Sequence, residues 1–405
     1  MKELLERVTK VIVTNSSEPV ILSSAIGRVI ARDVYSVKSV PFCDTCNVDG
    51  YAVIASSITQ LPMPLKKVGR SRPTKVFNEY LNPGEVVEIL ADMPLPPGAD
   101  SVIPRRYIES DDGYSVVCNE FINEGLNVSS TGIDVSKGDI IFAKGTVLNS
   151  RHVVLATVLN IPWLPVTKFP RIGILTSSSD NVKTYDDRFK NISACIAEAV
   201  SYFIESNGAM PVFLGQGVEL YDTPEEIILF KANLENALKS IDVLLVIGGV
   251  ENSAENIIFT SLNQRGAELT KQRISIGSGH SVILGNYGNM PVIGLPSHCV
   301  AFILFARLTV IPIINKIIGM KTENKHYAKL TRDLDEFDKN TDYLYGILTR
   351  KQDGEIAVSP VSAQDSLMLS VLTRTECMII VDLSLPLTTG TSVEIVMLSR
   401  FSNYN

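Results

Sequence analysis

Histidine is scarce in this chain, and its scarcity limits the metal sites that the chain can form. Four histidines occur among 405 residues, and none lies four positions from another, the spacing that places two ligands on one helix face. The sequence therefore predicts no histidine metal site. These residues are His152, His280, His298 and His326.

Cysteine is also sparse, with six residues spread over the whole length. A disulfide framework packs its cysteines densely into a short chain, so we expect reduced thiols. Cys43 and Cys46 do form a CxxC pair, a spacing used in metal binding and in redox chemistry. A closed zinc site needs a second cysteine pair or histidines. A role outside metal and redox chemistry is therefore favoured, while metal binding and redox use both stay open.

The chain has no excess of basic residues. Its net charge is −7, its charged fraction is 20% and its hydrophobic fraction is 45%. These values describe an ordinary, mildly acidic globular protein without a broad basic face. We therefore expect no nucleic-acid partner.

A clear targeting or membrane-spanning segment is missing as well. Residues 1–13 have the pattern of an amphipathic helix and lack the layout of a signal peptide, which predicts a cytoplasmic protein. The most apolar segment, residues 299–318, is interrupted by an arginine, a proline, an asparagine and a lysine. Because a spanning helix needs about 20 consecutive apolar residues, we expect a buried helix and no membrane partner.

The length and the changing patterns along the chain predict several domains. Between residues 61 and 122, short apolar runs split by proline and glycine indicate a small β domain. Prolines at 162, 165 and 170 mark a boundary, after which residues 171–319 alternate strand and helix patterns. This alternation predicts a parallel, doubly wound α/β sheet. Beyond about Lys321 short β-runs return, so a second β domain closes the chain.

Local signals predict where several helices begin and end. The apolar pattern of residues 19–34 fits a short helix. Asn149 or Ser150 can cap a helix that runs through Leu159. A further helix should end near Arg265, with Gly266 as its stop.

The stretch at residues 241–252, IDVLLVIGGVEN, is the strongest indication of a binding site. Its unbroken apolar run from Val243 to Ile247 is typical of a strand buried on both faces of a parallel sheet. Gly248 and Gly249 follow, and they let a ligand approach the main chain where the strand ends. Glycine turns also end ordinary strands, so a purely structural turn stays open.

A second tight turn lies at Asp49 and Gly50, just before the apolar residues 51–54. Asp-Gly is common in structural turns, where the carboxylate accepts hydrogen bonds from nearby main chain. The residues alone therefore leave open whether Asp49 is a turn residue or a site residue.

Four motifs and their order relate the chain to a known family. They are VDGYAV at 48–53, PLPPGADSVI at 94–103, IGGV at 247–250 and VIGLP at 292–296. Together they resemble the molybdopterin molybdenumtransferases, the molybdenum-insertion enzymes related to the C-terminal domain of gephyrin. The resemblance covers nearly the whole chain.

The resemblance implies a multidomain α/β plus β fold in a homodimer. It implies an N-terminal domain from residues 1–48 and 134–168 with a β insertion at 49–133. A central molybdopterin-binding-like α/β domain at 169–320 and a C-terminal β barrel at 321–405 complete the chain. Such enzymes insert molybdate into adenylylated molybdopterin with Mg²⁺ and release AMP.

The resemblance also implies the site residues. Molybdate and pyrophosphate are anions that need amides or cations, while Mg²⁺ needs carboxylates. The implied catalytic residues are Asp49, Asp180 and His280. The implied metal ligands are Asp49, Asp180 and Asn256, the last standing where the family has an aspartate. The implied pterin-binding or anion-binding residues are Gly248, Gly249, Val250, Arg273, Ser297 and His298.

Several of these positions differ from the family pattern, and they leave two functions open. Residues 277–281 replace a lysine-rich KPGKP segment, so Arg273 remains as a cation there and His280 either supplies a switchable charge or is a plain loop histidine. His298 and Cys299 either form a reactive pair or point apart at a helix start. The chain is then either an active molybdenum-insertion enzyme or a non-catalytic paralogue that keeps the dimeric scaffold, with or without pterin binding.

Overall fold

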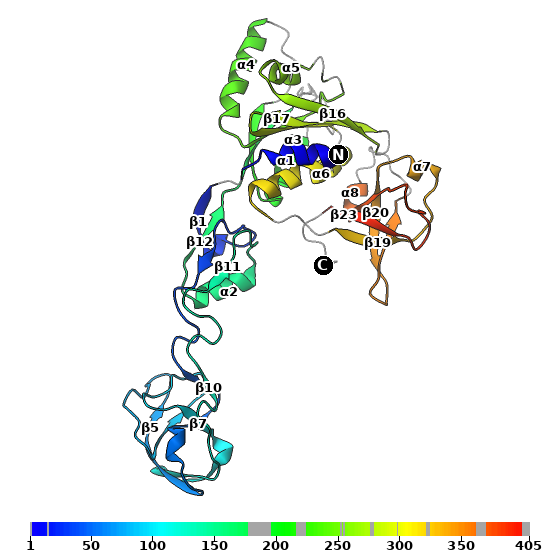
Figure 1. Cartoon of the computed structure of the whole chain (residues 1–405). Helices are drawn as coiled ribbons and strands as arrows, with labels where there is room; N and C mark the ends of the chain where they lie inside the picture. Colours follow the sequence, from blue (N-terminus) through cyan, green and yellow to red (C-terminus); the bar gives the residue numbers. More distant parts are fainter. Residues whose placement is uncertain are drawn as a thin grey trace, which may run out of the picture. The chain divides into compact units, whose positions relative to one another are not determined.

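The computed structural model (Figure 1) forms two compact units. One unit comprises Met1–Pro19, Gly27–Ala31 and Val166–Asn405, and the other comprises Val20–Ile26 and Arg32–Pro165. The structure describes residues 2–13, 16–176, 196–215, 224–251, 253, 256–275, 279–297, 299–320, 325–361 and 370–398.

A six-stranded sheet dominates the unit built on Arg32–Pro165 and confirms the β domain predicted at residues 61–122. Its strand order is β7-β4-β6-β5-β9-β8. Alternate residues of these strands, among them Tyr51, Leu65 and Ile103, form a buried core, as a sheet with one covered face requires. The strands are β4 (Gly50–Val53), β5 (Met63–Ser71), β6 (Glu85–Ile89), β7 (Ser101–Pro104), β8 (Ile108–Asp111) and β9 (Ser115–Cys118).

Short strand pairs and one helix make up the rest of this unit. Strand β2 (Val34–Tyr35) pairs with β11 (Ile140–Phe142), and β3 (Thr45–Cys46) pairs with β10 (Val128–Ser129). Helix α2 (Ser150–Val158) follows, as predicted. The side chain of Asn149 accepts hydrogen bonds from the main-chain N–H groups of Arg151 and His152 and caps its first turn.

The short helix predicted at residues 19–34 is wrong. Strand β1 (Ser17–Ile21) opens this segment and pairs with β12 (Trp163–Thr167), and a single 3₁₀ turn follows at Leu22–Ser24. The β-branched Val20 and Ile21 suit a strand, and Gly27 has a φ of +81° that no right-handed helix contains.

The α/β sheet of the other unit has the strand order β14-β13-β15-β18-β17-β16. Strands β14, β13, β15 and β18 run parallel, whereas β17 and β16 are antiparallel. The predicted parallel sheet therefore has an antiparallel edge. Only short connections join β16, β17 and β18, and short connections can link only antiparallel neighbours. The strands are β13 (Arg171–Thr176), β14 (Met210–Gly215), β15 (Val243–Ile247), β16 (Glu268–Ile274), β17 (His280–Tyr287) and β18 (Met290–Leu295).

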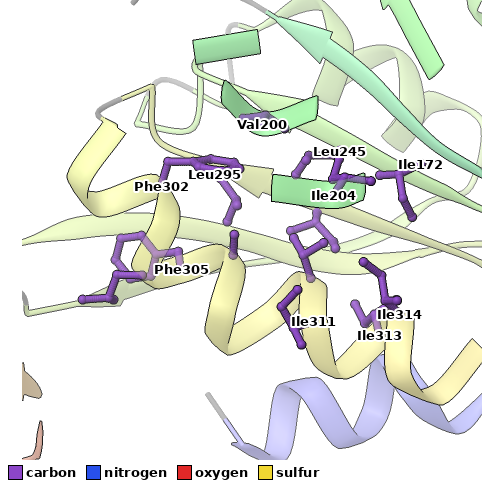
Figure 2. Close-up of a cluster of buried hydrophobic side chains, with 14 of the residues drawn as sticks. Ile172, Val200, Ile204, Leu245, Leu295, Phe302, Phe305, Ile311, Ile313 and Ile314 are labelled. Carbon is purple, nitrogen blue, oxygen red and sulfur yellow. The ribbon is translucent and has the colours of Figure 1, made fainter. Parts of the chain in front are cut away.

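Helices cover both faces of this sheet, which confirms the doubly wound architecture. From β15, Val243, Leu245 and Ile247 join one core with α1 (Lys2–Lys10), α3 (Ile196–Ser206) and α6 (Cys299–Ile317). The alternate residues Leu244 and Val246 join a second core with α4 (Pro224–Leu238) and α5 (Ile257–Gln264). Figure 2 shows Phe302, Phe305 and Ile311 of α6 in the first core. Because consecutive strand residues face opposite ways, β15 is apolar at every position.

The predicted burial of α6 is confirmed. By length and composition alone, Val300–Ile317 is apolar enough to cross a membrane. The expectation that its polar residues alone exclude a membrane span is therefore wrong. However, 78% of this window is buried inside the protein, which is the behaviour of a core helix.

The chain closes in a five-stranded barrel of order β19-β21-β20-β22-β23, which confirms the predicted C-terminal β barrel. Hydrogen bonds join it to α6. Arg307 donates from Nε to the carbonyl oxygen of Met397 (2.6 Å), and the Tyr345 hydroxyl donates to the carbonyl oxygen of Val300 (3.0 Å). The strands are β19 (His326–Leu330), β20 (Tyr343–Arg350), β21 (Ile356–Pro360), β22 (Cys377–Ile380) and β23 (Ser392–Met397).

Candidate functional site

The glycine turn after β15 lies at the carboxyl end of the central parallel strands, where ligands of open α/β sheets bind. Gly248 and Gly249 have φ values of +85° and +66°, which residues with side chains rarely adopt. The N–H of Gly248 donates to the carbonyl oxygen of Leu295 (2.8 Å), so β18 holds the start of the turn. Val250 is buried beneath it. The turn is therefore tied to β18 at its first residue.

Glu251, the residue after this turn, fastens it to β17 and β16. Its carboxylate accepts hydrogen bonds from the main-chain N–H (2.8 Å) and the hydroxyl (2.9 Å) of Ser281. Lys271 donates from Nζ to the carbonyl oxygen of Glu251 (2.5 Å). Sequence reasoning missed Glu251, Ser281 and Lys271 as site residues, because only the folded sheet brings residues 30 and 20 positions apart together.

The environment of Glu251 keeps it ionised. Burial raises the pKa of Glu251, but the hydrogen bonds from Ser281 and the positive charges of Lys271 and His280 outweigh burial, so the pKa lies below its usual value. A fixed negative charge therefore stands beside the glycine turn at neutral pH.

His280 is buried rather than placed on a loop, so that part of the prediction is wrong. It is the first residue of β17 and lies opposite Ile274 in the antiparallel ladder. Only 8% of its surface is exposed, and its ring packs edge-on against Phe305 with centroids 6.3 Å apart. The strand includes His280 because it pairs with the full length of β16. Its catalytic role stays a prediction.

Arg273 is an exposed cation on β16, directly opposite Ser281. Its guanidinium lies beside Gly279, where an added Cβ would come within 3.4 Å of Nε. Within residues 256–275 and 279–297, no carboxylate forms an ion pair with Arg273. The guanidinium therefore has the exposure needed to contact an anion at this edge.

Asn256 has a structural role at the start of α5. Its side-chain oxygen accepts the N–H of Ile258 (3.0 Å), and its carbonyl oxygen accepts the Thr260 hydroxyl (2.9 Å). This is the N-cap arrangement that satisfies a helix start. The residue is buried and brings no charge, and both properties suit a cap better than a magnesium ligand.

Three predicted site positions give little structural information. Asp180 and His298 lie outside the described residues. Ser297 is half-buried and lies two residues beyond Leu295, the last residue of β18, whose carbonyl oxygen accepts the N–H of Gly248. Cys299 is the first residue of α6.

Asp49 belongs to the other unit, where it precedes β4. Its Oδ1 accepts the N–H of Ala91 (2.8 Å), a bond across 42 positions rather than the local Asx turn expected. The next residue, Gly50, has no room for a side chain, because an added Cβ would lie 2.1 Å from the carbonyl oxygen of Ile103. Beyond Ala91, Asp92 adopts a φ of +64°, a backbone conformation that residues with side chains seldom take. The Asp49 side chain is exposed at this end of the sheet.

The thiols of the CxxC pair are not activated. Burial and then the charge of Asp44 raise the pKa of Cys43. Burial, with smaller effects from Asp92 and Asp49, also raises the pKa of Cys46, whose Sγ donates to the carbonyl oxygen of Leu90 (2.6 Å). A raised pKa favours the unreactive thiol form.

Comparison with family models identifies both ends of the chain. The model described as the MoeA N-terminal region (domain I and II) matches residues 1–159, and the model described as the MoeA C-terminal region (domain IV) matches residues 327–398. The chain belongs to the MoeA family. The resemblance drawn from the four sequence motifs is thereby confirmed.

Curated MoeA relatives align with almost the whole chain. The molybdopterin molybdenumtransferase of Bacillus subtilis is 25% identical over 93% of this chain and 89% of its own length. The molybdopterin molybdenumtransferase of Haemophilus influenzae is 24% identical over 89% of this chain and 88% of its own. A molybdopterin biosynthesis MoeA protein from Pyrococcus horikoshii shares the fold, with a TM-score of 0.78, 23% identity and coverage of 98% of each chain.

Proposed function

We propose that this MoeA-family chain acts in molybdenum cofactor biosynthesis as a molybdopterin molybdenumtransferase. In this reaction molybdate is inserted into adenylylated molybdopterin and AMP is released. The observation that carries the proposal is the pair of MoeA family models at both ends of the chain, together with relatives of this name that span it. The adenylylated substrate and the release of AMP are the parts that need an experiment.

The edge of the α/β sheet supplies the features that such a substrate needs. Gly248 and Gly249 leave no side chain between the main chain and a ligand, and Glu251 keeps this turn in place through Ser281. Arg273 offers an exposed guanidinium for a phosphate or molybdate oxygen. His280 directly precedes Ser281, the hydrogen-bond partner of Glu251, so we assign His280 a positioning role toward the turn.

The residues that the structure describes do not gather a magnesium site. No three of their histidine, cysteine, aspartate or glutamate side chains lie together as a metal-binding group. The side-chain oxygen of Asn256 caps α5, and both oxygens of Glu251 accept hydrogen bonds from Ser281. The magnesium requirement implied by the family resemblance stays a prediction, and no step of the proposal passes through the ion.

Asp49 supplies the second group of the proposal. One of its oxygens holds the N–H of Ala91, and its side chain is exposed, so the carboxylate can meet a substrate at the end of its sheet. We propose that Asp49 is a site residue, in addition to its bond to Ala91. We also propose that the protein is cytoplasmic and works as a homodimer. Light scattering on the purified protein measures the homodimer directly.

The experiment that tests the function follows AMP. The purified protein is incubated with adenylylated molybdopterin, molybdate and magnesium, and AMP is quantified by chromatography. Release above a control without protein, and dependent on molybdate, supports the proposal. Confirmed pterin binding without AMP release would contradict it and favour the non-catalytic paralogue.

A further inference from the structure

A pocket on the six-stranded sheet of the unit Arg32–Pro165 is lined by three arginines. It has a volume of about 270 Å³ and lies between the end of β5, the end of β6 and the turn after β7. Arg70 and Arg72 come from the first of these segments, and Arg105 comes from the last. Two segments distant in sequence thus bring three guanidinium groups to one small space.

Glu88 organises two of these arginines. On β6 it lies opposite Arg70 in the parallel ladder, and Arg70 Nε contacts its Oε2 at 2.7 Å. Arg105 donates from Nη2 to the other oxygen at 2.9 Å. Each guanidinium uses one nitrogen to contact Glu88 and has further N–H groups for a ligand, because a guanidinium carries five N–H donors. Glu88 therefore orders the two forks in advance, which reduces the entropy lost when an anion binds.

The charges of this cluster do not cancel. Glu88 is shared with Lys67, whose nearly buried ammonium also pairs with Asp111 at 2.9 Å. The cluster thus holds four basic groups against two carboxylates, so two positive charges remain.

Arg72 carries one of these unmatched charges. It stands in a tight turn held by main-chain hydrogen bonds with Lys75 (3.1 and 2.9 Å). Across residues 16–176, no carboxylate forms an ion pair with its guanidinium. The turn therefore places a cation at the pocket without neutralising it.

We propose that this pocket binds a tetrahedral oxyanion, either free or as the terminal group of a larger molecule. Arginine forks match the paired oxygens of phosphate and related oxyanions. The volume falls below the roughly 300–1,000 Å³ of sites for larger organic ligands, so the pocket takes the anion itself rather than a whole nucleotide. The proposal is additional to the transferase function and does not depend on it.

Calorimetric titration of the full-length protein with inorganic phosphate, and separately with molybdate, tests this site. Saturable binding of either anion supports the site only where the two pocket substitutions below weaken it, because Arg273 at the α/β sheet edge can also contact these anions. We expect Arg72→Ala and Arg105→Ala each to weaken binding by at least about tenfold, as the loss of a charged hydrogen bond requires. Arg72→Ala leaves the Glu88 ion pairs intact, so we expect this variant to fold as the wild type does. Circular dichroism checks that its loss of binding does not come from unfolding.

Arg106→Ala is the matched control. Arg106 neighbours Arg105 in sequence, but its guanidinium stacks 5.0 Å over the ring of Tyr107 and does not line the pocket. The control should bind phosphate and molybdate as the wild type does. The proposal is overturned if the wild type shows no saturable binding, if both pocket variants bind normally, or if Arg106→Ala loses as much affinity as they do. Because Arg72 and Arg105 have no part in the proposed transferase site, normal anion binding by both pocket variants leaves the transferase proposal untouched.

Discussion

Glu251 accepts both the main-chain N–H and the hydroxyl of Ser281, at 2.8 and 2.9 Å. Strand β18 ends at Leu295, and its ladder with β17 begins at Ile283, so β18 does not reach Ser281. The carboxylate after the glycine turn satisfies this N–H instead. This contact thus ties the glycine turn to the end of the sheet.

Replacing Ser281 with alanine should loosen the turn without unfolding the sheet. The substitution removes the hydroxyl bond and keeps the main-chain bond, so we expect a loss of about 0.5–1.5 kcal/mol in the free energy of unfolding. Affinity for adenylylated molybdopterin should fall as well, because the turn is less well ordered. Urea unfolding and a fluorescence binding titration measure the two effects. Ser240→Ala, which removes only a local bond to Ala237, is the control and should keep wild-type affinity.

Asp49→Asn separates the structural role of Asp49 from its charge. Asparagine keeps a side-chain oxygen for the N–H of Ala91, so unfolding free energy should change by less than about 0.5 kcal/mol. Turnover should nevertheless fall by at least about tenfold if the carboxylate meets the substrate, because a neutral amide cannot supply its charge. Asp49→Ala should lose both stability and turnover. Equal turnover of Asp49→Asn and wild type would show that this residue serves the turn alone.

Asp111 should make stability depend on pH in the acid range. The hydrogen bond from the Tyr51 hydroxyl (2.5 Å), opposed by burial and supported by Lys67, lowers the pKa of Asp111 from 3.8 to about 2. A lowered pKa stabilises the folded state above pH 3.8, and this contribution is lost as the pH falls toward about 2. The stability gap between wild type and Asp111→Asn should therefore shrink between pH 5 and pH 3 in urea unfolding experiments. A gap that stays constant over this range would refute the assignment.

Arg307 joins helix α6 to the C-terminal barrel. Its Nε donates to the carbonyl oxygen of Met397, and only 6% of the residue is exposed. Arg307→Ala should lower the free energy of unfolding by about 2–3 kcal/mol, because it removes a charged hydrogen bond and leaves a carbonyl group buried. The exposed Lys316 on the same helix gives the control Lys316→Ala, which should change stability little. Similar losses in both variants would argue against the interdomain role of Arg307.

Local patterns in the sequence predict much of this fold because their physical causes are local. The apolar run Val243–Ile247 indicates a strand covered on both faces, and its residues do alternate between two cores. Asn149 caps α2 through its own side chain. The antiparallel direction of β16 and β17 was not predicted, because a strand pattern carries no direction.

The candidate site is less predictable because tertiary contacts determine it. His280 follows a glycine and resembles a loop residue in sequence, yet pairing with Ile274 and packing on Phe305 bury it. Asn256 stands where the family has an acidic residue, but its contacts are those of a helix cap. The bond between Glu251 and Ser281 depends on where β18 ends, which no local pattern reports.

The most direct test of the transferase function is the molybdenum content of the pterin product. The protein is incubated with adenylylated molybdopterin, molybdate and magnesium, and the pterin fraction is separated and analysed for metal alongside AMP. We predict that molybdenum enters the pterin fraction in proportion to the AMP released, and that Asp49→Asn reduces both. A pterin fraction without molybdenum, from protein shown to bind the pterin nucleotide, would contradict the proposed function.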